Sequence, residues 1–91
     1  MNMALWRLMK IAKQDDKQAR LVASFLLAWW NPDTYGGFNL TDLWLVDEEI
    51  ADDMVAVTAL VHMLGEYPDD VVLESEFEEV VAQWRPHRLH S

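Results

Sequence analysis

Five of the ten aromatic residues of this chain lie between positions 29 and 44, around a proline and a Gly-Gly pair. This segment separates two apolar stretches that have helical spacing. Connecting segments are usually polar and run over the surface of a protein. A connection with this many large rings has to pack them against a core or against a partner. We therefore expect an aromatic Gly-Gly loop between the second and third helices that forms part of the fold.

Apolar residues recur at helical spacing in four segments, residues 5–12, 17–30, 48–64 and 73–84, and no strand-like alternation persists. The second segment has the widest apolar face and is the expected central helix. The inward residues predicted for the last two helices are Ile50, Met54, Val57, Val61 and Leu64, then Leu73, Phe77, Val80, Val81 and Trp84. With 91 residues there is room for one core. The prediction is all-α: a compact single-domain bundle of four helices over residues 1–86, with a short tail at 87–91.

Capping residues and helix breakers mark the ends of these segments. The expected N-caps are Asp15 or Asp16 for the second helix, Thr41 for a short turn, and Asp47 for the third helix. The expected stops are Asn31 with Pro32, Gly65 and Pro86, because proline lacks the amide proton and glycine accepts left-handed backbone. A further turn is expected at residues 67–70.

Charge is distributed unevenly along the chain, which has a formal net charge of −9. Residues 1–20 carry five Lys and Arg against two Asp, whereas residues 21–91 carry two Arg against fourteen acids. Binding to nucleic acid requires Lys and Arg to displace counterions from phosphate, so most of this surface would repel it. No signal peptide, membrane-length apolar run or cysteine is present, and a cytoplasmic protein is expected.

Six acids fall within residues 42–53: Asp42, Asp47, Glu48, Glu49, Asp52 and Asp53. Oxygen ligands of this kind suit Mg²⁺ or Ca²⁺, but the EF-hand spacing is absent and no histidine joins the group. Acids also favour the positive end of a helix dipole, which explains four of them without a ligand. His62 has no identifiable nucleophile partner. We therefore predict no metal, no cofactor, no catalytic residue and no enzymatic activity.

The tryptophans divide into expected core residues and one candidate anchor. Trp29, Trp44 and Trp84 are expected in the core. Trp30 and Tyr35 are the best candidates for an exposed aromatic anchor in a protein interface, with core packing as the alternative for the same pair. Base stacking would require interleaved basic residues, which the loop lacks.

Four strings carry a likeness to known proteins: FLLAWWN at 25–31, GGFNLTDLW at 36–44, IADDM at 50–54 and QWRPH at 83–87. With them the chain resembles, over residues 5–88, a family of small uncharacterised proteins encoded on proteobacterial plasmids and integrated mobile elements. The resemblance implies a context and no chemistry. Small acidic proteins of mobile elements often cover functional surfaces of host machinery, as inhibitors of CRISPR–Cas and other defence complexes do.

The function expected from these features is a non-enzymatic acidic protein-interaction module, a regulator or inhibitor that covers a basic, nucleic-acid-binding surface of a host complex. The acids at 42–53 would attract the partner, and Trp30 with Tyr35 would anchor it. The first alternative is a homodimer assembled through the first two helices. The second is a nucleic-acid-associated protein that binds through the basic first helix, with Arg7, Lys10, Lys13, Lys17 and Arg20. That helix could equally dock on the chain's own acidic flank or on a second copy.

Overall fold

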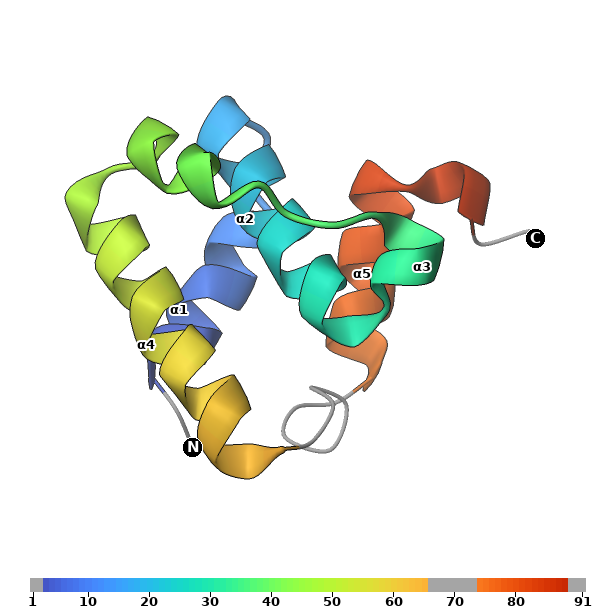
Figure 1. Ribbon diagram of the computed structural model, residues 1–91. Coiled ribbons are helices and arrows are strands. Elements are labelled where there is room, and N and C mark those ends of the chain that lie inside the picture. The colour runs from blue at the N-terminus through green and yellow to red at the C-terminus, as the bar shows by residue number, and fades with distance from the viewer. Residues whose placement is uncertain (1–2, 66–73, 89–91) are drawn as a thin grey trace.

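The computed structural model describes residues 3–65 and 74–88, and these two ranges contain helices and no strands. The elements are α1 (Met3–Ala12), α2 (Lys17–Trp30), α3 (Pro32–Tyr35), the 3₁₀ helix η1 (Leu40–Leu45), α4 (Glu48–Leu64), α5 (Glu74–Trp84) and the 3₁₀ helix η3 (Pro86–Arg88) (Figure 1). The all-α prediction is confirmed over these ranges. The expected turn at 67–70 and the expected inward Leu73 lie outside them.

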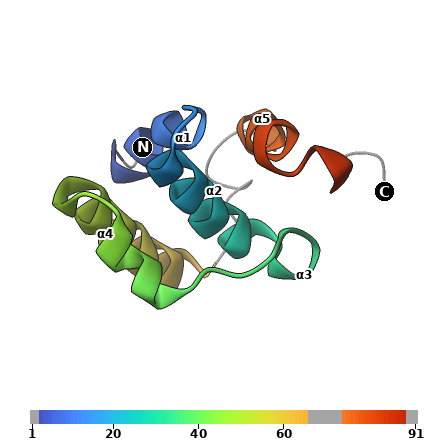
Figure 2. The ribbon, with the colours of Figure 1, turned by 90° about the horizontal axis from the view of Figure 1, so that it is seen from above.

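The four longer helices are not arranged as a regular four-helix bundle. Helices α1 and α2 pack against each other in the centre, α4 packs on α1, and α5 packs on α2. The two views agree that α4 and α5 lie on opposite sides of the central pair (Figures 1 and 2). The connection that includes α3 and η1 crosses from the end of α2 to the start of α4, as the sequence order requires.

The bounds of α2 agree with the predicted helix at 17–30, because both ends have strong local signals. Asp16 is the N-cap, and its side chain accepts a 2.7 Å hydrogen bond from the amide of Ala19. At the other end Pro32 follows Asn31, whose side chain accepts from the amide of Thr34 at 3.2 Å. Asn31 thus ends α2 and begins α3, so the chain turns immediately into another helix.

The core is built from one face of each longer helix. Its largest fully buried side chains are Leu5, Leu8, Met9, Val22, Leu26, Leu27, Met54, Val57, Phe77, Val80 and Val81. Among the predicted inward residues, Ile50, Val61 and Trp84 are partly buried against this core. Leu64 was expected inward and is 37% exposed, since it occupies the last turn of α4. Within the described ranges, no helix has the length and apolar character needed to cross a membrane.

The aromatic loop is anchored by side chains from distant parts of the sequence. Trp30 stacks on Tyr35 with ring centroids 5.5 Å apart, and its other contact is Phe77 of α5 at 5.3 Å. Arg85 donates hydrogen bonds to the carbonyl of Tyr35 and to the hydroxyl of Ser24, both at 3.2 Å. Gly36 has φ +96°, a conformation that side chains with a Cβ rarely adopt. The loop is therefore part of the fold, as predicted.

Trp44 is the exception among the aromatic residues of this segment, since it is 82% exposed. Its assignment to the core was wrong. Leu43 and Val46 are the residues near it that pack against the core. Two residues, Trp44 and Leu45, lie between them in the sequence, and both are exposed.

Two of the predicted caps need correction. Thr41 lies inside η1, which begins after Asn39, so it is not an N-cap. Asp47 is the N-cap residue of α4 by position, but its side chain makes no capping hydrogen bond. Asp47 is bound by the side chain of Gln18 instead. Gln18 donates to the Asp47 carboxylate at 3.3 Å and accepts from the Asp47 amide at 2.6 Å. Gly65 ends α4 in the left-handed conformation, as expected.

The contact between α5 and the aromatic loop predicts the effect of Phe77→Ala. Phe77 is fully buried and touches Trp30, so its truncation should cost about 3–5 kcal/mol of unfolding free energy. Urea unfolding followed by circular dichroism measures this cost. Glu78→Ala, at the exposed neighbouring position, is the matched control and should cost less than about 0.5 kcal/mol. Equal effects of the two substitutions would contradict the packing of α5 described here.

Candidate interaction surface

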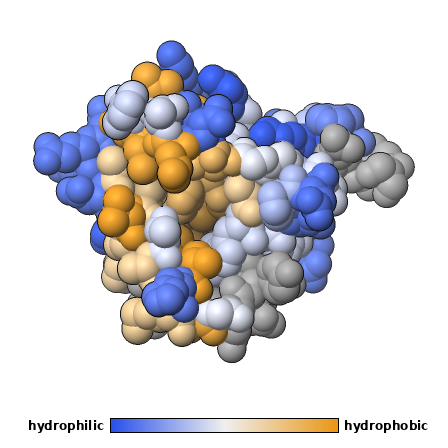
Figure 3. All heavy atoms as spheres, in the orientation of Figure 1, coloured by the Kyte–Doolittle hydropathy of each residue, from blue (hydrophilic) through white to orange (hydrophobic). Residues whose placement is uncertain are grey.

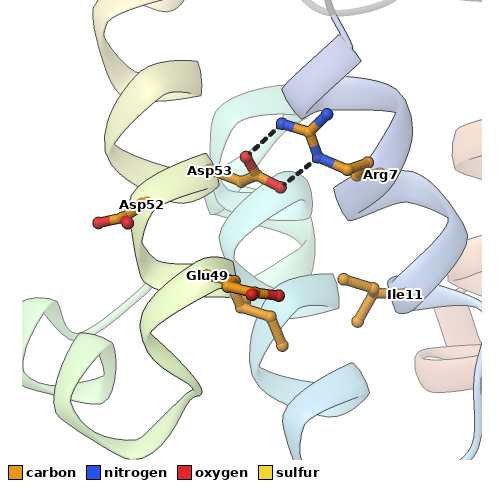
Figure 4. Close-up of a pocket in the computed structure, with 6 residues that line it drawn as sticks. Arg7, Ile11, Glu49, Asp52 and Asp53 are labelled. Carbon is orange, nitrogen blue, oxygen red and sulfur yellow. Dashed lines mark hydrogen bonds and ion pairs between the residues drawn. The ribbon is translucent and has the colours of Figure 1, made fainter.

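Three carboxylates project from the first two turns of α4 into solvent. Glu48, Glu49 and Asp52 are all exposed. They lie at the positive end of the helix dipole, which favours negative charge there. In Figure 4, Asp52 points away from α1, whereas Asp53 points toward it. The acidic start of α4 therefore has one side turned to solvent and one turned to α1.

Asp53 is bound by Arg7 of α1 through two parallel hydrogen bonds. Arg7 Nε and Nη2 donate to the two carboxylate oxygens of Asp53 at 2.8 and 2.7 Å (Figure 4). These hydrogen bonds from Arg7 lower the pKa of Asp53, against the opposing effect of burial. The same contact raises the pKa of Arg7. Asp53 is thus neutralised within the fold.

A second ion-pair group joins α1 to α5. Lys13 Nζ lies 2.6 Å from a carboxylate oxygen of Glu76 and 2.6 Å from one of Glu79. Burial opposes the charge on Lys13, but the hydrogen bonds that Lys13 donates to these two carboxylates raise its pKa. The hydrogen bond from Lys13 lowers the pKa of Glu79. The basic helix therefore docks on the chain's own acidic helices, which is one of the two arrangements expected for it.

The six acids predicted as one binding group are separated by these contacts. Asp53 is bound to Arg7, Asp47 is bound to Gln18, and Asp42 is half-buried in η1. Glu48, Glu49 and Asp52 remain exposed in the first two turns of α4, with Glu49 on the side of the helix that faces α1. We call these three residues the acidic start of α4. Sequence spacing could not distinguish these three acids from Asp47 and Asp53, because the residues that bind Asp47 and Asp53 come from α2 and α1.

A shallow cavity of about 370 Å³ lies between α1 and α4 (Figure 4). Its lining residues are Arg7, Ile11, Glu49, Ile50, Asp52 and Asp53. The guanidinium of Arg7 is already bound to Asp53, so the other charged groups that line the cavity are the carboxylates of Glu49 and Asp52. In the part of the chain that the structure describes, no three His, Cys, Asp or Glu side chains are placed to hold a metal ion.

The two predicted anchor residues, Trp30 and Tyr35, are half-buried and packed on each other, which corresponds to the packing alternative for this pair. Among the aromatic residues of ranges 3–65 and 74–88, the one most open to solvent is Trp44, four positions before Glu48. Sequence analysis missed it. No local pattern distinguishes Trp44 from Leu43 and Val46, the residues near it that pack against the core.

The chain belongs to the family of unknown function DUF7673, whose model matches residues 2–85. No curated protein and no solved structure matches the chain. The family match covers almost the whole fold described above, including the acidic start of α4 and Trp44. It supplies no activity, ligand or partner.

The contact between Arg7 and Asp53 predicts a pH effect. Because the folded-state pKa of Asp53 is lowered, the contact adds stability above the unfolded-state value of about 3.9, and this stability is lost as the pH falls through the folded-state pKa. Arg7→Gln should raise the pKa of Asp53 toward its ordinary value, as measured by NMR titration of the carboxyl carbon. Lys10→Gln removes the same charge from an exposed position of α1 and should leave it unchanged. An unmoved Asp53 titration in Arg7→Gln would refute this pairing.

Proposed function

We propose that this protein is a non-catalytic interaction module that binds a basic surface of another protein through the acidic start of α4. The observation that carries the proposal is the separation of the acids on this helix. Asp53 is neutralised by Arg7, while Glu48, Glu49 and Asp52 are exposed, and the exposed Trp44 precedes Glu48 by four positions in the sequence. Charge for attraction and a ring for anchoring thus occur in two consecutive elements, η1 and α4.

Electrostatics supports a partner that is positively charged. The chain has a net charge of −9, so its overall field attracts a basic body and accelerates encounter. The carboxylates of Glu48, Glu49 and Asp52 can then accept hydrogen bonds from Lys and Arg of that body. Interactions of this kind set association rate and orientation more than they set affinity. Much of the affinity must therefore come from an apolar contact, and Trp44 is suited to supply it.

The ring of Trp44 is better suited than the ring of Trp30 to anchor a protein partner. Interface residues that dominate binding energy are enriched in Trp, Tyr and Arg and become fully desolvated in the complex. Trp44 has 82% of its surface available for that change, whereas Trp30 already contacts Tyr35 and Phe77. The proposal therefore replaces Trp30 and Tyr35 with Trp44 as the short-range contact.

The target class that suits this charge is a protein complex that holds nucleic acid in a basic groove. An acidic, compact body can occupy such a groove in place of the phosphate backbone. We propose that the protein acts as a regulator or inhibitor of such a complex, a CRISPR–Cas or other defence complex being one example. This part of the proposal rests on charge and on the resemblance to proteins of mobile elements. The identity of the protein that binds to this chain in its native host will support or contradict this part of the proposal.

A direct nucleic-acid contact through α1 is less well supported. Of the five basic residues available at the N-terminal end, Arg7 is bound to Asp53, and Lys13 is bound to Glu76 and Glu79. Phosphate would have to displace these carboxylates, which repel it. The remaining cations are Lys10, Lys17 and Arg20, and Lys17 and Arg20 belong to α2.

Reversing two charges at the acidic start of α4 should remove binding. We expect Glu48→Lys/Glu49→Lys to lower affinity for the partner at least tenfold, about 1.4 kcal/mol, because attraction becomes repulsion. The partner is first isolated by affinity capture from the native host with elution by a salt gradient, and affinities are then measured by calorimetry.

The matched control for that variant is Glu74→Lys/Glu78→Lys, which makes the same charge change at two exposed positions of α5. Circular dichroism should show unchanged helical content in both variants. Equal losses of affinity in the two would indicate a general effect of net charge and would contradict a site at α4.

The anchoring role predicts a different signature for Trp44→Ala. Because Trp44 contributes apolar contact and no charge, its truncation should cost about 2 kcal/mol of binding free energy or more and leave the salt dependence of binding unchanged. Affinity measured across a series of NaCl concentrations tests both points. Stability should stay the same, since the ring is 82% exposed. An unchanged affinity would remove Trp44 from the interface.

A further inference from the structure

The second half of α4 differs from the other exposed helices because it has no charged residue. From Met54 to Leu64 the sequence contains no Asp, Glu, Lys or Arg. Helix α5, by contrast, exposes Glu74, Glu78 and Glu79 on its outer face. A helix at the surface of a globular protein normally has a polar face opposite its buried face. One that is apolar all round is normally covered on both sides.

One line of outward residues in this segment is apolar over three turns, with the exposed Thr58 and His62 beside it. Val55 is 60% exposed and Met63 is 80% exposed, with the exposed Ala59 midway between them. Residues spaced by four lie above one another on one side of a helix. Met54 and Val57 occupy the opposite side and are fully buried. Val55, Ala59 and Met63 therefore define an outer face of α4 that no part of the described structure covers.

Exposed hydrophobic side chains concentrate in this region of the molecule. Of the seven large hydrophobic residues exposed in the described ranges, six belong to η1 or α4: Leu40, Trp44, Leu45, Val55, Met63 and Leu64. Figure 3 shows hydrophobic residues gathered over these elements, with hydrophilic residues over much of the rest of the same face. An exposed apolar patch of this kind indicates a contact surface.

We propose that the outer face of α4 binds the same face of a second copy of this chain, with the two α4 helices antiparallel. The face is complementary to itself under a twofold axis, as a symmetric dimer interface must be. Asp52 and His62 lie at its two ends, both exposed and equally distant in sequence from Val57. An axis that crosses the outer face at the height of Val57 along the helix places Asp52 opposite the partner's His62. The ring N–H of that histidine can donate to the carboxylate.

The antiparallel arrangement also keeps the acids of the two copies apart. Asp52 and His62 are separated by ten residues, about 15 Å along the helix axis. The two acidic starts then lie at opposite ends of the interface, farther apart than the screening length of about 8 Å at physiological salt. Parallel pairing would instead bring like charges together. In the middle, Ala56 and Ala59 allow the helices to approach closely.

This dimer differs from the one expected from the sequence, which used the first two helices. The apolar faces of α1 and α2 already pack in the core and are not available for a second copy. Their residues Leu5, Leu8, Leu26 and Leu27 are fully buried. The α4 dimer goes beyond the proposed function and is compatible with it. Each copy keeps Glu48 and Glu49 at an outer end of the pair, so the assembly presents its acidic surface twice.

Molecular mass in solution tests the proposal first. Sedimentation velocity of the full chain over a concentration series should show a shift from the 10.6 kDa monomer to twice that mass. Raising the salt concentration should strengthen the dimer, because it screens repulsion between two bodies of charge −9. Binding to a basic partner should weaken under the same change, so failure of one idea is distinguishable from failure of the other. A monomer at every concentration and salt overturns the proposal and leaves the face to another partner.

Variants of the outer face locate the contact. Val55→Glu/Met63→Glu should abolish dimerisation and preserve helical content, because both side chains are exposed in the monomer. The matched control is Ser75→Glu/Ala82→Glu, which adds the same charge at two exposed positions of α5 and should still dimerise. A dimer that survives the first variant, or is lost equally in both, overturns the assignment to α4.

Cross-linking tests the antiparallel direction without disturbing the apolar contact. The chain has no cysteine, so introduced thiols have no competitor. A mixture of the Asp52→Cys and His62→Cys proteins, oxidised with diamide, should form disulfide-linked pairs between the two variants. Asp52→Cys alone should remain unlinked. Efficient linking of Asp52→Cys to itself would show parallel pairing and overturn the arrangement.

Discussion

The basic helix α1 determines which acids of this protein are neutralised and which remain available. Its Arg7 binds Asp53 of α4, and its Lys13 binds Glu76 and Glu79 of α5, so two acidic helices are held on either side of one basic element. Exposed ion pairs contribute little to stability, and burial of apolar side chains supplies most of it. The main effect of these ion pairs is that they determine which carboxylates are bound within the fold. They leave the solvent side of α4 as the acidic surface.

Local signals predicted the helices, while the site depended on contacts that the sequence does not display. The limits of α2 followed from Asp16 and from Pro32, which act within one turn of the helix. The burial of Trp30 depends on Phe77, and the position of the loop depends on Arg85, both about fifty residues away in the chain. Trp44 was assigned to the core because large rings usually pack there, but in this segment Leu43 and Val46 make the contacts with the core. The division of the acids required knowing that Arg7 reaches Asp53.

The same helix, α4, combines two kinds of surface along its length. Its first two turns carry exposed carboxylates next to Trp44, and the turns after Met54 carry an outward face without charge. The first suits long-range attraction of a basic protein, and the second suits a short-range contact between copies. The two proposals share Asp52 and otherwise use different residues, and they respond in opposite directions to salt. They describe an acidic module that is presented twice by a symmetric pair.

The central claim is that a basic partner contacts the acidic start of α4 and Trp44. A photo-crosslinking amino acid in place of Trp44, expressed in the native host, tests it most directly, with the same group in place of Glu78 as the reference position on α5. The account predicts that position 44 is cross-linked to a Lys- and Arg-rich segment of one protein and that position 78 is not. Cross-links confined to position 78, or an acidic segment captured at position 44, would contradict it.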